Sequence, residues 1–379
     1  MKVFICGDII NQFSENQFIS PSLIDLISSM DYAICNFEGC LRKAEDQFVS
    51  MTQHASTLTH LRNAGFNLLL CANNHIADCG LTGLEYTLKH IRATGLEHVG
   101  AGFNYEDVYA PKMLTINDET ICIINVCEAQ IGYFQKNKDT FGYAWMGDPE
   151  LENLIAEMSR KSDYTIVVCH AGLEHFDMPL PQFRDIYRRY CDIGASCVVA
   201  MHPHIAQGIE VYNGKPIAYS LGNFYFPRSI DSNSEDVENQ SFSLILNLEN
   251  GVVTFTPIFH RMDNLCVYKA KEDELDFNLI ELSDMLNCEK YDKALEVRIP
   301  DVYSKLIEPH FMYVFNGTQF EDSLSLKVKK IIRYLLGKTF YENKEKGSNR
   351  QILRMIVNES YRYAIETSMR IKLNKSTSI

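Results

Sequence analysis

The sequence predicts an α/β fold, and three observations support this. Short runs of apolar and β-branched residues recur along the chain, segments with helical spacing separate them, and a tight-turn signal follows. The predicted buried strands are 3–6, 32–35, 68–71, 121–126, 165–169, 197–200 and 217–219. Because strand and helix alternate, the chain is expected to form an α/β architecture around a sizeable core.

Helices are predicted between these strands. The apolar residues with helical spacing are Leu84, Leu88 and Ile91 in one segment, and Leu151, Leu154, Ile155 and Met158 in another. Ser20 and Asp148 each precede a proline, and a short polar acceptor before a proline is typical of a helix N-terminus. We therefore expect helices to begin at Pro21 and Pro149.

A β-hairpin is predicted around Asn250 and Gly251. The two residues lie between the apolar runs 242–248 and 252–257, and both readily adopt the positive backbone angles of a two-residue turn. The hairpin is expected to add antiparallel strands to the α/β sheet.

The charge distribution predicts two modules. The 379 residues carry a formal net charge of −13, which argues against broad nucleic-acid binding by the main body. From Ser323 to the end, 13 Lys and Arg face 4 acidic residues, so this part is basic and the remainder strongly acidic. We predict a first domain over 1–264 and a mainly helical region over 265–379. The basic end is interpreted as a solvated appendage, with binding to an anionic polymer or membrane surface as the alternative.

The cysteines and apolar runs predict a location. Cysteines stand singly inside apolar runs and no CxxC pair occurs, so reduced thiols are expected rather than a disulfide framework. The N-terminal apolar run is too short for a signal peptide, and no run approaches the ~18 residues of a membrane span. These features favour the cytoplasm.

Metal-ligand side chains follow five of the predicted strands. They are Asp8, then Asn36 and Glu38, then Asn73, Asn74 and His75, then His170 with Glu174, then His202 and His204. The carboxyl ends of strands in an open α/β sheet line one edge, so these residues are expected to converge. Imidazole and carboxylate together suit manganese, iron or zinc. The number of candidates favours a pair of metals, which can clamp both oxygens of a phosphoryl transfer.

These motifs resemble a known family. The segments CANNHIADCG (71–80), CHAGLEHF (169–176) and MHPHIAQGIEVYNGKPIAYSLGNFYF (201–226), with GD at 7–8 and NFEG at 36–39, look like CapA-type capsule or poly-γ-glutamate synthesis proteins. That family is similar to the calcineurin-like metallophosphoesterases. The resemblance covers residues 1 to about 260. It implies a two-sheet sandwich flanked by helices, in α/β/β/α order, with the helical C-terminal region outside it.

The resemblance also implies roles for individual residues. The metal ligands would be Asp8, Glu38, Asn74, His170, His202 and His204, with Glu38 bridging two ions. His75 would act as general acid. Asn36, Asn73, Glu174 and Asn223 would support the ligands or bind substrate. Asp78 is interpreted as a residue that orients the following helix.

One position departs from the metallophosphoesterase pattern. Those enzymes begin with Asp-x-His, whereas this chain has Ile10 at the third position. One ligand of the first metal is therefore missing. The site is expected to hold one ion, or two with another group such as Asn36 in the vacant position.

Two functions remain open from the sequence. The first is a metal-dependent, phosphoesterase-like hydrolase in capsule or cell-envelope polymer synthesis, acting on a phosphoester or an anionic polymer; amide hydrolysis is a weaker variant. The second is a non-catalytic assembly protein that binds metal and polymer. Many members of the family are anchored or exported, which is the alternative to a cytoplasmic location.

Overall fold

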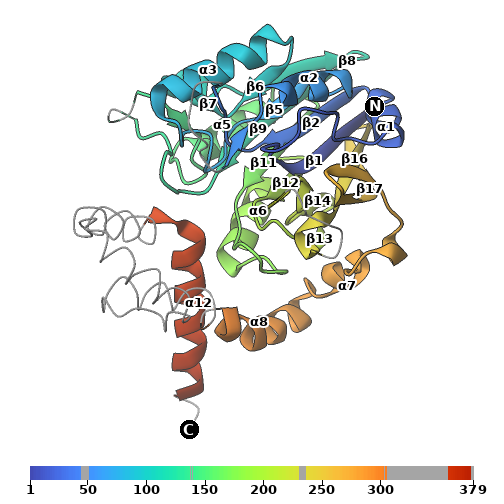
Figure 1. Cartoon of the computed structure of the whole chain (residues 1–379). Helices are drawn as coiled ribbons and strands as arrows, with labels where there is room; N and C mark the ends of the chain where they lie inside the picture. Colours follow the sequence, from blue (N-terminus) through green and yellow to red (C-terminus); the bar gives the residue numbers. More distant parts are fainter. Residues whose placement is uncertain are drawn as a thin grey trace, which may run out of the picture. The chain divides into compact units, whose positions relative to one another are not determined.

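Figure 1 shows the computed structural model, which describes residues 1–43, 51–136, 138, 140–229, 236–302, 304 and 357–376. The chain divides into two compact units, Met1–Tyr291 and Asp292–Ile379. All the strands described belong to the first unit.

The first unit contains two large sheets. One has eight strands in the order β18 (Cys266–Lys269), β17 (Val252–Asp263), β16 (Gln240–Glu249), β1 (Lys2–Ile9), β2 (Tyr32–Phe37), β5 (Leu68–Leu70) and β6 (Glu97–Val99), with β15 (Asn223–Tyr225) also paired to β1. The other has six, in the order β13 (Ile209–Tyr212), β14 (Lys215–Ala218), β12 (Cys197–Met201), β11 (Tyr164–His170), β9 (Glu119–Cys127) and β8 (Lys112–Ile116). The strands that carry or precede the candidate ligands run parallel to one another: β1, β2 and β5 in one sheet, β11 and β12 in the other. Every predicted strand coincides with one of these.

Two short pairings complete the strands. They are β3 (Cys40–Leu41) with β4 (Thr52–Gln53), and β7 (Ala101–Gly102) with β10 (Gly142–Tyr143). The predicted hairpin is confirmed: β16 and β17 pair from Glu249 opposite Val252, and the two turn residues have φ of 52° and 75°. Its antiparallel strands continue the first sheet beyond β1.

The core lies between the two sheets. Val3, Ile5 and Ile34 of the first sheet and Ile166 and Val168 of the second belong to one cluster of buried side chains. Alternate residues of each strand point to this layer because side chains alternate across a sheet. The predicted sandwich is therefore confirmed, and the ligand-bearing strand ends of both sheets open to the same edge.

Helices cover the outer faces of the sandwich. They are α1 (Pro21–Ser28), α2 (Ser56–Asn63), α3 (Gly80–Ala93), α4 (Tyr105–Tyr109), α5 (Leu151–Met158), α6 (Pro181–Ile193) and α7 (Leu279–Asp284), with 3₁₀ turns at Val237–Asn239 and Glu272–Glu274. In Figure 1, α3 and α6 lie on opposite sides of the strands. The apolar positions predicted for α3, at Leu84, Leu88 and Ile91, are its buried face.

One of the two predicted helix starts is wrong. Helix α1 begins at Pro21, as expected. Helix α5 begins at Leu151 rather than Pro149, because Asp148 uses its carboxylate to accept from the N–H of Glu150 in a turn before the helix. Asp148 thus stabilises a turn and lies two residues before Glu150, the residue that caps the helix.

Two further helices reach into the second unit or lie within it. Helix α8 (Cys288–Val302) crosses the boundary between the units, and α12 (Glu359–Ser376) belongs to the second. Most of the basic, periodic segment predicted after residue 323 lies outside the described residues. No helix in the described parts of the chain has the length and apolarity to cross a membrane.

Candidate functional site

The polar strand ends converge in two adjoining clusters. The first, here called the buried cluster, is Asp8, Glu38 and His170; all three are fully buried. In each cluster, one potential ligand atom per residue lies within 4.8 Å of the others. Five strand ends distant in sequence thus deliver side chains to one place, as the sequence predicts.

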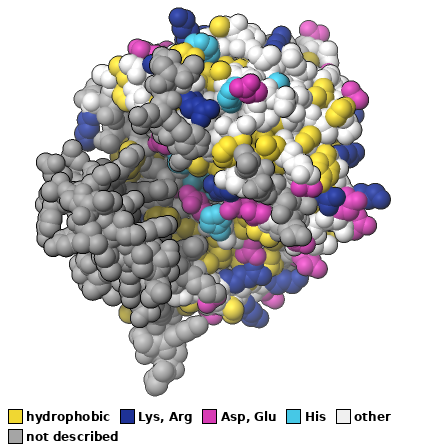
Figure 2. All heavy atoms as spheres, viewed as in Figure 1, with side chains coloured by type: hydrophobic (Ala, Val, Ile, Leu, Met, Phe, Trp, Pro, Cys, Tyr) yellow, Lys and Arg dark blue, Asp and Glu magenta, His cyan; other side chains and the backbone are white. Residues whose placement is uncertain are grey.

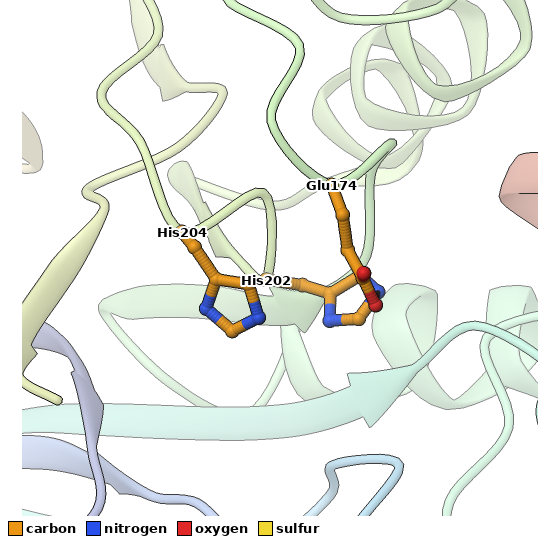
Figure 3. A group of neighbouring side chains, drawn as sticks. All are labelled: Glu174, His202 and His204. Carbon is orange, nitrogen blue, oxygen red and sulfur yellow. Dashed lines mark ion pairs between the residues drawn. The ribbon is translucent and has the colours of Figure 1, made fainter. Parts of the chain in front are cut away.

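The second group, here called the histidine cluster, is Glu174, His202 and His204. Figure 3 shows the two imidazoles beside one another, with the carboxylate of Glu174 reaching toward His202 from a separate loop. The clusters are contiguous: the N–H of His202 donates to Asp8 Oδ2 at 3.2 Å, and His204 Nδ1 lies 3.6 Å from the same oxygen. Glu174, which the sequence assigned to a supporting role, has the position of a ligand.

A polar circuit joins the remaining predicted residues. Asn36 Nδ2 donates to Asp8 Oδ1 at 2.7 Å and lies 3.2 Å from His170 Nδ1. On the other side of that ring, His170 Nε2 lies 3.1 Å from Asn74 Oδ1. Asn74 therefore faces the buried cluster through its oxygen, the atom a metal would bind.

The circuit continues through two residues that the sequence analysis missed. Asn74 Nδ2 donates to Gln130 Oε1, and Gln130 Nε2 donates to Glu128 Oε1 at 2.9 Å while lying 3.1 Å from His202 Nε2. Glu128 is fully buried, 3.7 Å from the same His202 nitrogen. Both residues follow strand β9, which was predicted. A metal-ligand side chain at the end of a strand is the signal that identified candidates after the other five strands. It applies equally to Glu128.

His75 carries a carboxylate partner. Its Nδ1 lies 2.7 Å from Asp78 Oδ2, and its Nε2 faces the site, 4.0 Å from Glu38 Oε1. A carboxylate in this position fixes the orientation of the ring. The interpretation of Asp78 as a residue that only orients the helix is therefore incomplete, because its side chain acts on the predicted general acid.

Two predicted supporting residues have different roles. Asn73 joins the loop after β5 to the backbone on either side of Glu38. Its Nδ2 donates to Phe37 O, and its Oδ1 accepts from the N–H of Gly39. Asn223 touches the site directly, with its Oδ1 2.9 Å from His204 Nδ1. Asn223 thus orients a ligand, whereas Asn73 sets the position of the loop that carries Glu38.

The backbone in and beside the histidine cluster is strained. His175, His202 and His204 have φ of 58°, 110° and 64°, in the left-handed region that residues with a Cβ seldom occupy. Such conformations persist only where the surroundings hold them, and they concentrate at functional sites. Here the N–H bonds from His202 to Asp8 and from His175 to Pro203 O supply that constraint.

The charges of the buried cluster call for a cation. Among the residues that the structure describes, Glu38 has no hydrogen-bond partner for either carboxylate oxygen, although both are buried. Burial, and then the neighbouring Asp8, raise the pKa of Glu38 well above its usual range; burial likewise raises the pKa of Asp8. Isolated buried carboxylates are costly unless a cation or hydrogen bonds compensate them.

The imidazoles fit the same role. Burial lowers the pKa of His170 and of His204 to about 3, so both are neutral at physiological pH and can offer a lone pair. Neutral imidazoles beside buried carboxylates form a nitrogen and oxygen donor set that suits a borderline divalent metal. The residues present therefore fit one or two such ions.

Ile10 stands where the sequence pattern lacks a ligand. Its side chain is fully buried and its N–H donates to Tyr225 O, so it belongs to the core. Asn36 Oδ1, by contrast, is buried without a hydrogen-bond partner in the described part of the chain. This oxygen beside Asp8 is suited to the substitute role suggested from the sequence.

The cysteine prediction is wrong at one pair. Cys40 and Cys79 form a disulfide that joins the loop after Glu38 to the start of α3, just after Asp78. Their separation of 39 residues hides the pairing in the sequence. The cysteines that lie inside the strands, such as Cys35 and Cys169, are free and buried as predicted.

Comparisons with known proteins agree with the motifs. A sequence profile described as bacterial capsule synthesis protein PGA_cap matches residues 3–228. The PGA biosynthesis protein CapA of Bacillus subtilis is 32% identical over 219 residues, 55% of this chain and 56% of that protein. The capsule biosynthesis protein CapA of Bacillus anthracis is 28% identical over 231 residues, 58% and 56% of the two chains. The chain thus spans about half the length of these curated relatives.

Solved structures show a looser similarity. A hypothetical protein from Thermus thermophilus has a TM-score of 0.47 at 18% identity, covering 72% of this chain and all of that one. The calcineurin-like phosphoesterase YfkN from Bacillus subtilis has a TM-score of 0.41 at 11% identity, covering 78% of this chain and 98% of that one. Similarities of this size do not establish a shared activity.

Proposed function

The chain belongs to the PGA_cap family of bacterial capsule synthesis proteins, and from that premise we propose that it is a metal-dependent hydrolase of a phosphoester or related anionic linkage. Its role would lie in the synthesis of capsule or another cell-envelope polymer. The observation that carries the proposal is Glu38, a fully buried carboxylate without a hydrogen-bond partner in the described residues, beside a second buried carboxylate. Burying a charged carboxylate without hydrogen bonds destabilises the fold, and a bound cation would offset this destabilisation.

The residues divide into a binding set and a proton-transfer pair. The binding set is Asp8, Glu38, Asn74, His170, His202 and His204, with Asn36 and Glu174 adjoining it. A divalent cation bound there would polarise the anionic linkage and offset the charge that develops on it. The chain itself supplies orientation, through Gln130 and Asn223, and excludes water from the buried side.

His75 supplies the proton. Its Nε2 faces the clusters while Nδ1 lies against the Asp78 carboxylate, so the ring is oriented to pass a proton from Nε2 to the leaving oxygen. A positioned general acid of this kind contributes about 10²- to 10⁴-fold in rate.

The test combines metal content with turnover. The full chain would be loaded with manganese, its metal content measured, and hydrolysis of bis(p-nitrophenyl) phosphate followed. We expect about two equivalents of metal. His75→Ala should keep the metal and lose about 10²-fold or more of the rate. His90→Ala is the matched control, because that ring contacts Tyr86 of its own helix, through a bond to Tyr86 O and through ring packing.

A second function is favoured by Ile10. With an apolar side chain at a ligand position, the chain could bind metal and anionic polymer without turnover and serve polymer assembly. Metal binding without hydrolysis of any phosphoester would support this assembly role. Absence of transition metal after manganese loading would overturn both functions.

A further inference from the structure

A carboxylate at the rim of the site is held between two cationic or proton-donating side chains. Glu238 accepts from Arg228 through Nη2 at 2.6 Å and Nε at 2.8 Å, and its other oxygen lies 3.2 Å from His175 Nδ1. The Glu238 side chain is 14% exposed, whereas those of Arg228 and His175 are 37% and 41% exposed. The carboxylate is thus sheltered while both of its partners face solvent.

The side chains of Arg228, Glu238 and His175, here called the rim group, adjoin the histidine cluster. His175 directly follows Glu174, and its ring centroid is 6.1 Å from that of His204. The Phe226 ring lies between the two regions: its centroid is 5.0 Å from that of His204 and 4.2 Å from the Arg228 guanidinium. The rim group therefore lies beside His204, one of the residues that would bind metal.

Electrostatics agree with this placement. The Arg228 charge opposes the burial that raises the pKa of Glu38, so the guanidinium acts on the buried cluster itself. Figure 2 shows acidic, basic and histidine side chains close together near the middle of the face in view. An anion drawn to Arg228 would arrive next to the candidate metal site.

The chemistry of the rim group matches a carboxylate. A guanidinium offers a planar fork of donors suited to carboxylate oxygens, and His175 adds a donor to the second oxygen. Because the side chains of Arg228 and His175 are both partly exposed, their contacts with Glu238 contribute little net stability and can be exchanged for contacts with another carboxylate at low cost.

We propose that Arg228 and His175 form a carboxylate-binding subsite beside the metal clusters, which Glu238 occupies until a substrate carboxylate displaces it. The substrate class is then an anionic polymer with a carboxylate close to the linkage held over the clusters. This subsite rests on the proposed function for the position of that linkage, although its binding chemistry is independent of turnover. A purely structural ion pair between Arg228 and Glu238 is the competing explanation.

The experiment measures binding of a short oligo-γ-glutamate to the manganese-loaded full chain by calorimetry. The reference ligand is an oligomer of equal length whose α-carboxylates are replaced by uncharged α-carboxamides. We expect Arg228→Gln to weaken oligo-glutamate binding by about tenfold, because one charge-assisted bidentate contact is lost. Glu238→Gln should strengthen it by a few fold, since the internal competitor no longer carries a charge. Arg160→Gln, which changes an exposed arginine beyond α5, is the matched control and should leave affinity unchanged.

Opposite effects of the two rim variants support the subsite. If both variants weaken binding, or if Arg228→Gln leaves it unaltered, the ion pair is structural and the subsite is overturned. Melting temperature and metal content of each variant separate misfolding from loss of the contact. Hydrolysis of bis(p-nitrophenyl) phosphate, which has no carboxylate, reports on the proposed function alone, and the control Arg160→Gln should leave it unchanged.

Discussion

The buried cluster and the histidine cluster adjoin one another but are built differently. Asp8 and His170 lie on strands β1 and β11, and Glu38 directly follows β2, so the buried cluster is fixed by the ladders of both sheets. The histidine cluster instead lies on loops whose residues have positive φ, and its Glu174 is only partly buried. The buried cluster is closed to water, whereas the histidine cluster is open on the side of Glu174.

The two clusters also differ in the number of charged groups that they contain. The buried cluster has two carboxylates and one imidazole, and neither oxygen of Glu38 has a hydrogen-bond partner among the described residues. The histidine cluster has two imidazoles and the single carboxylate of Glu174, and its imidazoles contact Glu128, Gln130 and Asn223. We expect the buried cluster to hold metal more tightly and the histidine cluster to meet the substrate.

The largest expected effect is that of Glu38→Gln. Removing this charge should abolish metal binding at the buried cluster and hydrolysis with it, as measured by metal content and turnover. In the metal-free protein at pH 8, the same change should raise the free energy of unfolding by about 1 to 3 kcal/mol, because an uncompensated buried charge is lost. Glu249→Gln, at an exposed strand end, is the control for both measurements. A metal-free variant less stable than the parent would contradict our account of Glu38.

Asp78→Asn tests the proton-transfer pair rather than either cluster. Loss of the carboxylate on His75 Nδ1 should lower the hydrolysis rate by about 10- to 100-fold with metal content unchanged. Asp25→Asn, on the exposed face of α1, should have no effect. A fall in metal content would place Asp78 among the groups that hold the metal.

Glu128→Gln should act on the histidine cluster alone. Metal affinity there is expected to fall by about tenfold, because the carboxylate that supports His202 and Gln130 loses its charge. A manganese titration should then show one unchanged and one weakened step. Equal weakening of both steps would mean that the two clusters form a single binding unit.

The smallest expected effect is on pH dependence without metal. Burial lowers the pKa of His204 to about 3 from an ordinary 6.5, so its contribution to stability is complete above pH 6.5 and is lost as pH falls toward 3. Glu38, whose pKa is raised, contributes oppositely: its stability is present below its ordinary 4.5 and is lost as pH rises. Denaturation curves of His204→Gln should therefore flatten on the acidic side and those of Glu38→Gln on the alkaline side, by up to roughly 1.4 kcal/mol per pH unit. The reverse pattern would contradict these assignments.

Local chemistry made much of the site predictable. Parallel strands place residues at their carboxyl ends along one edge. Asp8 and His170 lie at the ends of buried strands, and the other predicted ligands lie just beyond such ends: Glu38, Asn74, His202 and His204. The predicted strands and the hairpin at Asn250 depend on side-chain period and turn chemistry, which are local properties. Glu128 directly follows strand β9, so it carries the same local signal.

The sequence by itself thus determined the α/β layers, the ligand-bearing strand ends and the family. Only the tertiary structure decided which ligands share a cluster, that Asp78 holds His75, that Cys40 bonds to Cys79, and that Glu238 occupies a rim between Arg228 and His175. The physical reason is distance along the chain. Strand and turn preferences are set by neighbouring residues, whereas these contacts depend on how loops from different strands meet once both sheets have packed.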